Sequence, residues 1–244
     1  MAYNEALSEV FFSNDNGEIA FMASFPRLEV LRAVVDSGLI PVFHHPDAEV
    51  AFEVVRACAR GGARVVEFTH RADFAQDVFA QVAQRCRREL PDVVFGVGSI
   101  RDPHIAALYL TTGANYVVSP TLQPELAKLL NGRKVAYFPG CATATEIQSA
   151  EELGCEIVKV FPGDCIGGPS FIKSVRGPSP WSSLMPTGGV ELSEESIRAW
   201  IGAGAVAVGM GSKLVTKDVL ASGNYDQLAE NTAKALGWIR DARA

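Results

Sequence analysis

Short apolar, β-branched runs alternate with longer amphipathic stretches from Ile40 to Lys213, and this alternation limits the fold more than any other feature of the sequence. Eight of the short runs are typical of strands. These are Ile40–His45, Val65–Arg71, Val93–Ile100, Tyr116–Pro120, Val135–Gly140, Glu156–Pro162, Leu184–Gly189 and Ala205–Gly211. Helical spacing is found in Asp47–Arg60, Asp73–Glu89, Pro103–Thr112, Gln123–Asn131, Ala144–Leu153, Pro169–Val175, Ser193–Ile201 and Tyr225–Arg240. Because strands that alternate with helices pair in parallel, the sequence predicts an α/β fold.

Eight such units over about 200 residues match a (β/α)8 TIM barrel better than an open doubly wound sheet. Open sheets typically have fewer strands, and no GxGxxG motif follows the first strand here. Phe25–Ser37 is predicted to be an extra N-terminal amphipathic helix that closes the bottom of the barrel. No linker divides the chain, so we expect one domain over residues 1–244, with a leader and helix in 1–39 and the barrel in 40–244.

The composition argues against several classes of partner. The net charge is −6 and Lys and Arg form no cluster, so the chain lacks the electrostatic footprint of a nucleic-acid-binding protein. No apolar stretch reaches the roughly 18 residues of a membrane span, and the first five residues lack the basic start of a signal peptide. We therefore expect a cytoplasmic protein with neither a nucleic-acid nor a membrane partner.

The five cysteines are scattered, with no CxxC pair and no histidine at metal-ligand spacing. We interpret them as reduced thiols that mostly pack in the core. Cys141 and Cys165 each follow a Phe-Pro-Gly at a strand end, which leaves a reactive thiol open at either position. His44, His45, His70 and His104 form no metal set such as HExxH, and we expect neither a metal nor a cofactor.

Lys159 is a lone amine in the apolar run Ile157–Pro162. An ammonium group that is buried in such a strand tends to lose its proton and becomes a nucleophile near neutral pH. This is what Schiff-base chemistry requires. The alternative is a lysine whose stem packs while its head reaches solvent or a carboxylate.

Three polar residues end the second predicted strand. The two-residue period of a strand places Glu67, Thr69 and Arg71 on one side, toward the mouth of the barrel, where the active sites of TIM barrels lie. A carboxylate can shuttle a proton, and a guanidinium can hold a substrate carboxylate. The alternative is a Glu67–Arg71 ion pair that only neutralises itself.

Small residues end three further strands. Gly96 and Gly98 let a ligand approach the backbone beside Ser99, although they also suit barrel closure and a helix cap. Turns at Thr187-Gly188-Gly189 and Gly211-Ser212 follow the seventh and eighth predicted strands, where TIM barrels often bind phosphate. Either turn alone is also typical of an ordinary tight turn.

Four motifs occur in the order Glu67-x-Thr69-x-Arg71, Lys159-Val160-Phe161-Pro162, Pro186-Thr187-Gly188-Gly189 and Gly211-Ser212. Together they resemble the 2-keto-3-deoxy-6-phosphogluconate (KDPG) aldolase family, which includes 4-hydroxy-2-oxoglutarate (KHG) aldolases. The resemblance implies a metal-independent class I aldolase, usually a homotrimer, that forms pyruvate and glyceraldehyde 3-phosphate. It implies the following roles: a Schiff base at Lys159, proton transfer by Glu67, carboxylate binding by Arg71, walls around the pyruvyl group at Ser99, Pro120 and Phe161, and a phosphate pocket at Thr187, Gly188, Gly189, Gly211 and Ser212.

The sequence departs from the family pattern at several positions. Ser99 replaces a usual Thr, Gly163-Asp164 replaces Ala-Glu, and Lys213 follows Ser212 where relatives tend to be apolar. His44 and His45 stand where many relatives have Arg, and the sequence assigns no role to them or to Lys213. Three alternatives stay open: the phosphogalactonate isomer, unphosphorylated hydroxy-oxoglutarate, and a non-catalytic barrel that senses a sugar phosphate.

Overall fold

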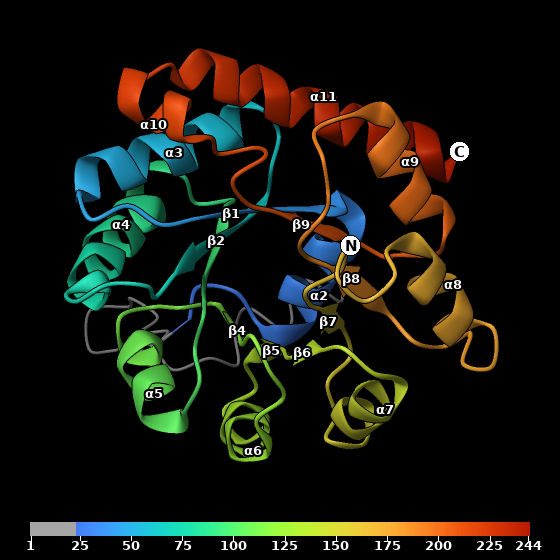
Figure 1. Cartoon of the computed structure of the whole chain (residues 1–244). Coiled ribbons are helices and arrows are strands. Elements are labelled where there is room, and N and C mark those ends of the chain that lie inside the picture. Colours follow the sequence, from blue (N-terminus) through green and yellow to red (C-terminus); the bar gives the residue numbers. More distant parts are fainter. Residues whose placement is uncertain (1–22) are drawn as a thin grey trace, which may run out of the picture.

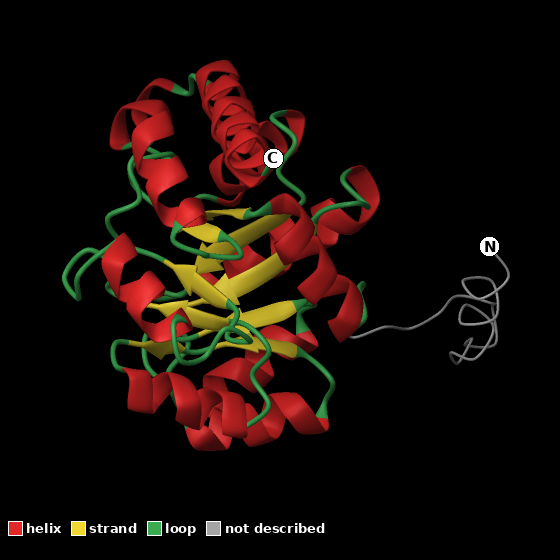
Figure 2. Ribbon diagram, turned by 90° about the vertical axis from the view of Figure 1, so that its right-hand side faces the viewer, coloured by secondary structure: helices red, strands yellow, loops and turns green. Residues whose placement is uncertain are grey.

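The computed structural model describes residues 23–244, which form an α/β fold with helices around parallel strands (Figures 1 and 2). The strands are β1 (Leu39–Phe43), β2 (Val65–Thr69), β3 (Val94–Gly98), β4 (Tyr116–Val118), β5 (Ala136–Phe138), β6 (Gly140–Cys141), β7 (Val158–Val160), β8 (Leu184–Pro186) and β9 (Val208–Met210). The helices are α2 (Arg27–Ser37), α3 (Ala48–Arg60), α4 (Ala75–Glu89), α5 (Pro103–Thr111), α6 (Pro124–Gly132), α7 (Ala144–Glu152), α8 (Pro169–Arg176), α9 (Glu194–Gly202), α10 (Lys217–Ser222) and α11 (Tyr225–Arg243).

The strands form two parallel sheets. The larger has the order β5-β4-β3-β2-β1-β9, and the smaller has the order β6-β7-β8. An isolated parallel bridge between Thr187 and Gly209 joins the ends of β8 and β9. Gly209 permits this approach, because a Cβ there would lie 2.3 Å from the Thr187 Oγ1. The carboxyl ends of β8 and β9 are therefore neighbours.

The prediction of one continuous strand over Val135–Gly140 was wrong. This segment is divided into β5 and β6, with Pro139 between them. β5 pairs with β4, whereas β6 pairs with β7. Pro139 has no N–H to donate to a ladder, so the pairing changes partner at this residue.

Alternate residues of the strands face two different cores. Strand residues in the inner cluster include Ile40, Val65, Val94, Tyr116 and Met185. Their neighbours in sequence pack outward against the surrounding helices in a second, larger cluster. This alternation sets the direction of the polar side chains near the strand ends, because residues two apart share a face.

Helix α2 precedes β1 and packs against the inner cluster through Val30, Ala33 and Val34. Figure 1 shows α2 near the centre of the ring of helices. It ends at Gly38, whose φ of 71° lies in the left-handed region that glycine adopts readily. The chain turns there directly into β1.

Several element boundaries differ from the prediction. The second strand ends at Thr69 rather than Arg71, because the following residues leave the ladder to form the loop before α4. Helix α4 begins at Ala75 rather than Asp73, since Phe74 has a left-handed φ of 60° as the N-cap residue. Helix α10 was missed. It is short, with a cap from the Thr216 side chain and a stop at Gly223.

The cysteines divide into two groups. Cys58, Cys86, Cys141 and Cys155 are buried, as expected for packing residues. Burial raises the pKa of the Cys141 thiol to about 12, which argues against a reactive thiol there. Cys165 is exposed, so the expectation of packing was wrong at this position. None of the helices within residues 23–244 is both long enough and apolar enough to cross a membrane.

Candidate active site

Lys159 lies in the middle of β7 and is 6% exposed. It shares the inward face with Ile157, which belongs to the inner cluster. Its Nζ lies 4.9 Å from the centroid of the Phe161 ring. Burial lowers the pKa of Lys159, Glu67 raises it, and Arg71 lowers it. The strand therefore holds an amine that loses its proton more readily than an ordinary lysine.

Glu67 lies on β2 and is 2% exposed. Its carboxylate occupies the space next to Gly98, where a Cβ would lie only 1.7 Å from the Oε1 atom. Burial raises the pKa of Glu67, while the charges of Lys159 and Arg71 lower it. The predicted acid–base residue and the predicted nucleophile thus interact electrostatically inside the ring of strands.

Arg71 and Ser99 come together beyond the ends of β2 and β3. The Arg71 Nε donates to the Ser99 Oγ at 3.5 Å, and the guanidinium is exposed. Ser99 has a left-handed φ of 64°, which is uncommon for a residue other than glycine. Thr69, unlike Arg71, is buried at 1% exposure, and its hydroxyl donates to the Phe43 carbonyl at 3.2 Å. That hydroxyl ties β2 to β1.

The two histidines after β1 lie beside this site. The His44 Nδ1 is 2.9 Å from the Thr69 carbonyl oxygen, so Nδ1 carries the proton that it donates. Burial is the largest cause that lowers the pKa of His44, and the charge of Arg71 contributes in the same direction. The His45 Nδ1 accepts from the Asp47 amide at 3.1 Å, next to the start of α3.

The two glycine-rich turns lie side by side because of the bridge between β8 and β9. Gly188 and Gly189 have φ values of 93° and 73°, which other residues rarely adopt. A Cβ on Gly189 would also lie 2.3 Å from the Asp164 Cβ, so the loop after β7 packs directly on this turn. Gly211 is half-buried and Ser212 is exposed.

Lys213 forms an exposed ion pair with Glu191, at 3.0 Å between Nζ and Oε1. The sequence assigned no role to Lys213, and the structure pairs its charge with a carboxylate. The predicted wall residues Pro120 and Phe161 lie in the segments that follow β4 and β7. Phe161 and Pro120 are both half-buried, and the Pro120 carbonyl would lie 2.2 Å from a Cβ on Gly140.

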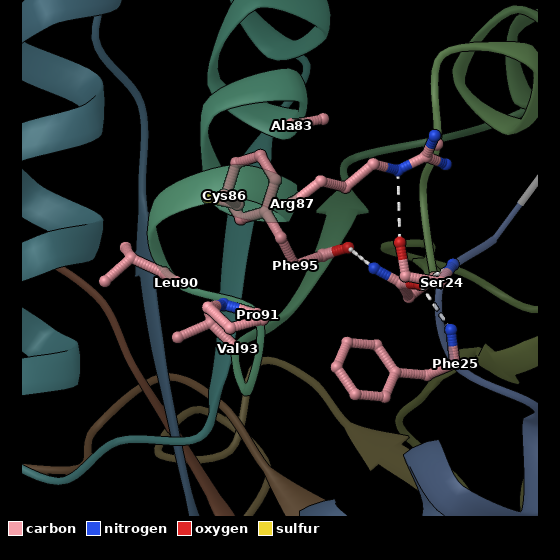
Figure 3. Close-up of a pocket in the computed structure, with 11 residues that line it drawn as sticks. Ser24, Phe25, Ala83, Cys86, Arg87, Leu90, Pro91, Val93 and Phe95 are labelled. Carbon is pink, nitrogen blue, oxygen red and sulfur yellow. Dashed lines mark hydrogen bonds between the residues drawn. The ribbon is translucent and has the colours of Figure 1, made fainter. Parts of the chain in front are cut away.

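A cavity of about 240 Å³ lies at the opposite end of β3, next to Ser24, Phe25 and Arg87 (Figure 3). The Arg87 Nε donates to the Ser24 Oγ at 3.1 Å, and the Phe25 amide donates to Asn115. None of the predicted site residues lines this cavity. The chemistry-bearing side chains gather at the carboxyl ends of the strands instead.

Within residues 23–244, no group of three His, Cys, Asp or Glu side chains is arranged to hold a metal ion. The charged groups that do converge are an amine, a carboxylate and a guanidinium. This set suits nucleophilic attack on a carbonyl, proton transfer and the binding of a carboxylate.

Comparison with known proteins gives a consistent result. The model of the KDPG and KHG aldolase family matches residues 30–231. A 2-dehydro-3-deoxy-phosphogluconate aldolase of Treponema pallidum is 30% identical over 213 residues, which cover 86% of this chain and 99% of that protein. The KHG/KDPG aldolase of Escherichia coli K12 is 29% identical over 198 residues, which cover 81% of this chain and 90% of that protein.

A solved structure is also similar. It is the KDPG aldolase from Legionella pneumophila, with pyruvate captured at low pH as a covalent carbinolamine intermediate. The TM-score is 0.75 at 25% identity, and the match covers 82% of this chain and 95% of that chain. The chain therefore belongs to the KDPG and KHG aldolase family.

Proposed function

We propose that the protein is a class I aldolase that cleaves 2-dehydro-3-deoxy-6-phosphogluconate to pyruvate and glyceraldehyde 3-phosphate. One observation carries the proposal: the buried Lys159 amine shares an inner face and an electrostatic field with the buried Glu67 carboxyl. The names of the relatives in the same family support the substrate. The carbinolamine of the Legionella enzyme is the kind of adduct that an amine forms with pyruvate.

The proposed reaction begins when the Lys159 amine attacks C2 of the keto acid. The carbinolamine loses water and becomes an iminium ion, which can accept the electron pair of the C3–C4 bond. Glu67 takes the proton of the C4 hydroxyl, the C3–C4 bond breaks, and the aldehyde leaves an enamine on Lys159. Glu67 then returns the proton to C3, and hydrolysis of the imine releases pyruvate and the free amine.

The surrounding residues position the substrate in this proposal. Arg71 holds the carboxylate, next to Ser99, which orients the carbonyl for attack. Ser99, Pro120 and Phe161 form the walls around the pyruvyl group, while the Thr69 hydroxyl, which donates to Phe43, fixes the strand that carries Glu67. The backbone amides of two turns, together with the side chains of Thr187 and Ser212, bind the phosphate. The glycines of these turns are Gly188, Gly189 and Gly211.

The proposal extends to the architecture. The two sheets are taken as one closed (β/α)8 barrel, because β5 and β6 follow each other across Pro139 and a bridge joins the ends of β8 and β9. Helix α2 covers the inner core at the amino ends of the strands and serves as the extra helix of the barrel. We further propose that residues 1–244 form one domain, and that the protein is a cytoplasmic homotrimer.

Reductive trapping tests the nucleophile. Incubation with pyruvate and borohydride is expected to add the reduced pyruvyl group to Lys159, where mass spectrometry of peptides locates it. Lys159→Arg removes the neutral nucleophile and is expected to abolish the adduct, whereas Lys173→Arg is the matched control. A protein that stays unmodified, or that carries the label only on Lys173 or Lys213, contradicts the proposal.

Glu67→Gln separates imine formation from bond cleavage. The variant keeps the shape of the side chain but cannot take the C4 proton, so turnover is expected to fall by roughly 10²–10⁴-fold. Trapping of pyruvate on Lys159 should persist. Turnover equal to that of the unchanged protein would remove Glu67 from the mechanism.

Substrate comparison tests the two glycine-rich turns. Cleavage of the phosphorylated six-carbon acid is expected to be faster than cleavage of its dephosphorylated form and of 4-hydroxy-2-oxoglutarate. Equal rates would contradict a phosphate pocket. The phosphogalactonate isomer is the second candidate substrate and belongs in the same assay. Ligand binding without turnover of any of these compounds would instead indicate a non-catalytic sensor.

A further inference from the structure

Tyr116 carries a buried hydroxyl group without a hydrogen-bond partner in the described part of the chain. The side chain is 0% exposed and lies in the inner cluster, on β4. A buried hydroxyl without a partner costs free energy that a phenylalanine would not cost. Its position therefore calls for a functional explanation.

The Tyr116 ring lies in the same trough as the Glu67 carboxylate. Two glycines on the inward face of β3, Gly96 and Gly98, leave the space that forms this trough. A Cβ on Gly96 would lie 2.4 Å from the Tyr116 ring, and a Cβ on Gly98 would lie 1.7 Å from the Glu67 Oε1. Residues two apart on a strand are separated by roughly 6–7 Å, so the ring and the carboxylate occupy adjacent spaces. The Tyr116 ring also packs on Phe138, at 5.4 Å between centroids, which limits its movement.

The two groups also interact through charge. Burial raises the pKa of Tyr116 well above its ordinary value, and the charge of Glu67 raises it further. Tyr116 therefore keeps its proton and remains a donor. The titratable groups that interact with Glu67 are Lys159 from β7, Arg71 from the loop after β2 and Tyr116 from β4. β1 contributes the apolar Val42 opposite Glu67, and β3 contributes Val94, Gly96 and Gly98 on that face, none of which is titratable.

We propose that Tyr116 is a positioning residue, whose hydroxyl donates a hydrogen bond to the Glu67 carboxylate through one bridging water. This bond holds the carboxylate toward Lys159 and stabilises its charged form. A hydrogen bond to the charged form of a carboxyl group makes that group easier to ionise. Tyr116 would thus keep Glu67 available as a base in a site where burial alone favours the protonated acid. The assignment rests on the proposed role of Glu67 in proton transfer.

The pH profile of kcat/KM for Tyr116→Phe tests this assignment. Loss of the donor is expected to move the acidic limb, where Glu67 takes up its proton, upward by roughly 0.5–1 pH unit, and to leave the basic limb in place. An unchanged acidic limb would overturn the proposal, since a packing role alone does not move it.

Tyr137→Phe is the matched control. It also removes one buried hydroxyl, but that hydroxyl bonds to the Ser119 Oγ at 2.6 Å, on the outer side of the sheet. Its Tm should fall, while the acidic limb should stay in place. An equal upward shift of the limb in both variants would show that hydroxyl loss in general moves it, and would overturn the assignment to Tyr116.

A measurement without turnover separates this inference from the proposed function. NMR titration of a protein with ¹³C-labelled glutamate carboxyls, with Glu67→Gln to assign the signal, reports the pKa of Glu67 directly. The pKa should be higher in Tyr116→Phe. If it rises while no substrate is cleaved, the pairing stands and the aldolase proposal fails. If substrate is cleaved while the pKa is the same in both proteins, the aldolase stands and the pairing fails.

Discussion

Lys159 and Glu67 are ionisable residues that the fold buries almost completely, at 6% and 2% exposure. Burial moves their pKa values in opposite directions from the ordinary values, down for the amine and up for the carboxyl. Each shift reduces the charge of the isolated group, while the attraction between the two opposes both shifts. Because burial brings the two pKa values closer together, transfer of a proton between the two groups costs less free energy than it would in water, which suits the proposed reaction.

The buried amine should cost stability. The folded protein lowers the pKa of Lys159, so between that pKa and the ordinary value the folded state binds fewer protons than the unfolded state, and stability rises as pH rises through this window. The cost is fully present below the folded pKa. Lys159→Met is therefore expected to raise the Tm at about pH 7 by roughly 2–4 °C, with a smaller gain at about pH 9.5. Thermal unfolding at both pH values measures this.

Lys213→Met is the control for that variant. The Lys213 ammonium forms an exposed pair with Glu191, and exposed pairs contribute little to stability. Its Tm should stay nearly unchanged at both pH values. A Tm of Lys159→Met below that of the unchanged protein at both pH values would show that burial of this amine is not costly.

Gly98 is expected to be indispensable for the position of Glu67. Gly98→Ala would place a Cβ 1.7 Å from the Oε1, so the carboxylate must move by more than an ångström. Displacements of this size typically reduce a rate by about 10²-fold, so kcat should fall by roughly that factor. Gly132→Ala is the control, because a Cβ there meets nothing within 4 Å. If Gly98→Ala retains full activity, the carboxylate position described here is not required.

At the scale of elements, local capping signals explain why the ends of the predicted helices were located more accurately than the ends of the predicted strands. Helix α7 begins with a capping box, in which the Thr143 side chain accepts from the Glu146 amide and the Glu146 carboxylate accepts from the Thr143 amide. Such local signals are visible in the sequence. A strand ends instead where its neighbour stops pairing, as β2 ends at Thr69, and the identity of the neighbour is not local information.

Thr143→Ala removes one half of this capping box. The expected cost is about 1 kcal/mol in the free energy of unfolding, measured by urea denaturation. Thr145→Ala makes the same chemical change within α7, at an exposed position after the cap, and should be neutral or slightly stabilising. Equal losses in the two variants would contradict a specific role of the cap.

For the whole molecule, the arrangement of strands brings residues from distant parts of the sequence to one end. Glu67, Lys159 and the turns after β8 and β9 belong to separate strand–helix units. Parallel pairing places the carboxyl ends of all these strands together, which is why polar residues at strand ends converge. The apolar side chains of Trp181 and Phe74 remain 72% and 71% exposed on the outside of the same chain.

The proposed trimer predicts a solution mass of about three times the 26.1 kDa subunit, independent of loading concentration over the micromolar range. Light scattering coupled to size exclusion measures this mass. Exposed aromatic side chains such as Trp181 are common at subunit contacts, so Trp181→Ser is a useful second variant. A mass of one subunit for the unchanged protein would contradict the trimer.

The sequence alone determined the alternation of strands and helices, which residues share a strand face, and that an amine and a carboxylate face inward. Periodicity carries this information, because residues two apart in a strand share an environment whatever surrounds it. Only the tertiary structure decided that Pro139 divides a strand, that the Thr69 hydroxyl is used by Phe43, and that Tyr116 lies in one trough with Glu67. These contacts join residues that are distant in sequence. They depend on strand register and on glycines in the neighbouring strand, and no local sequence pattern records either.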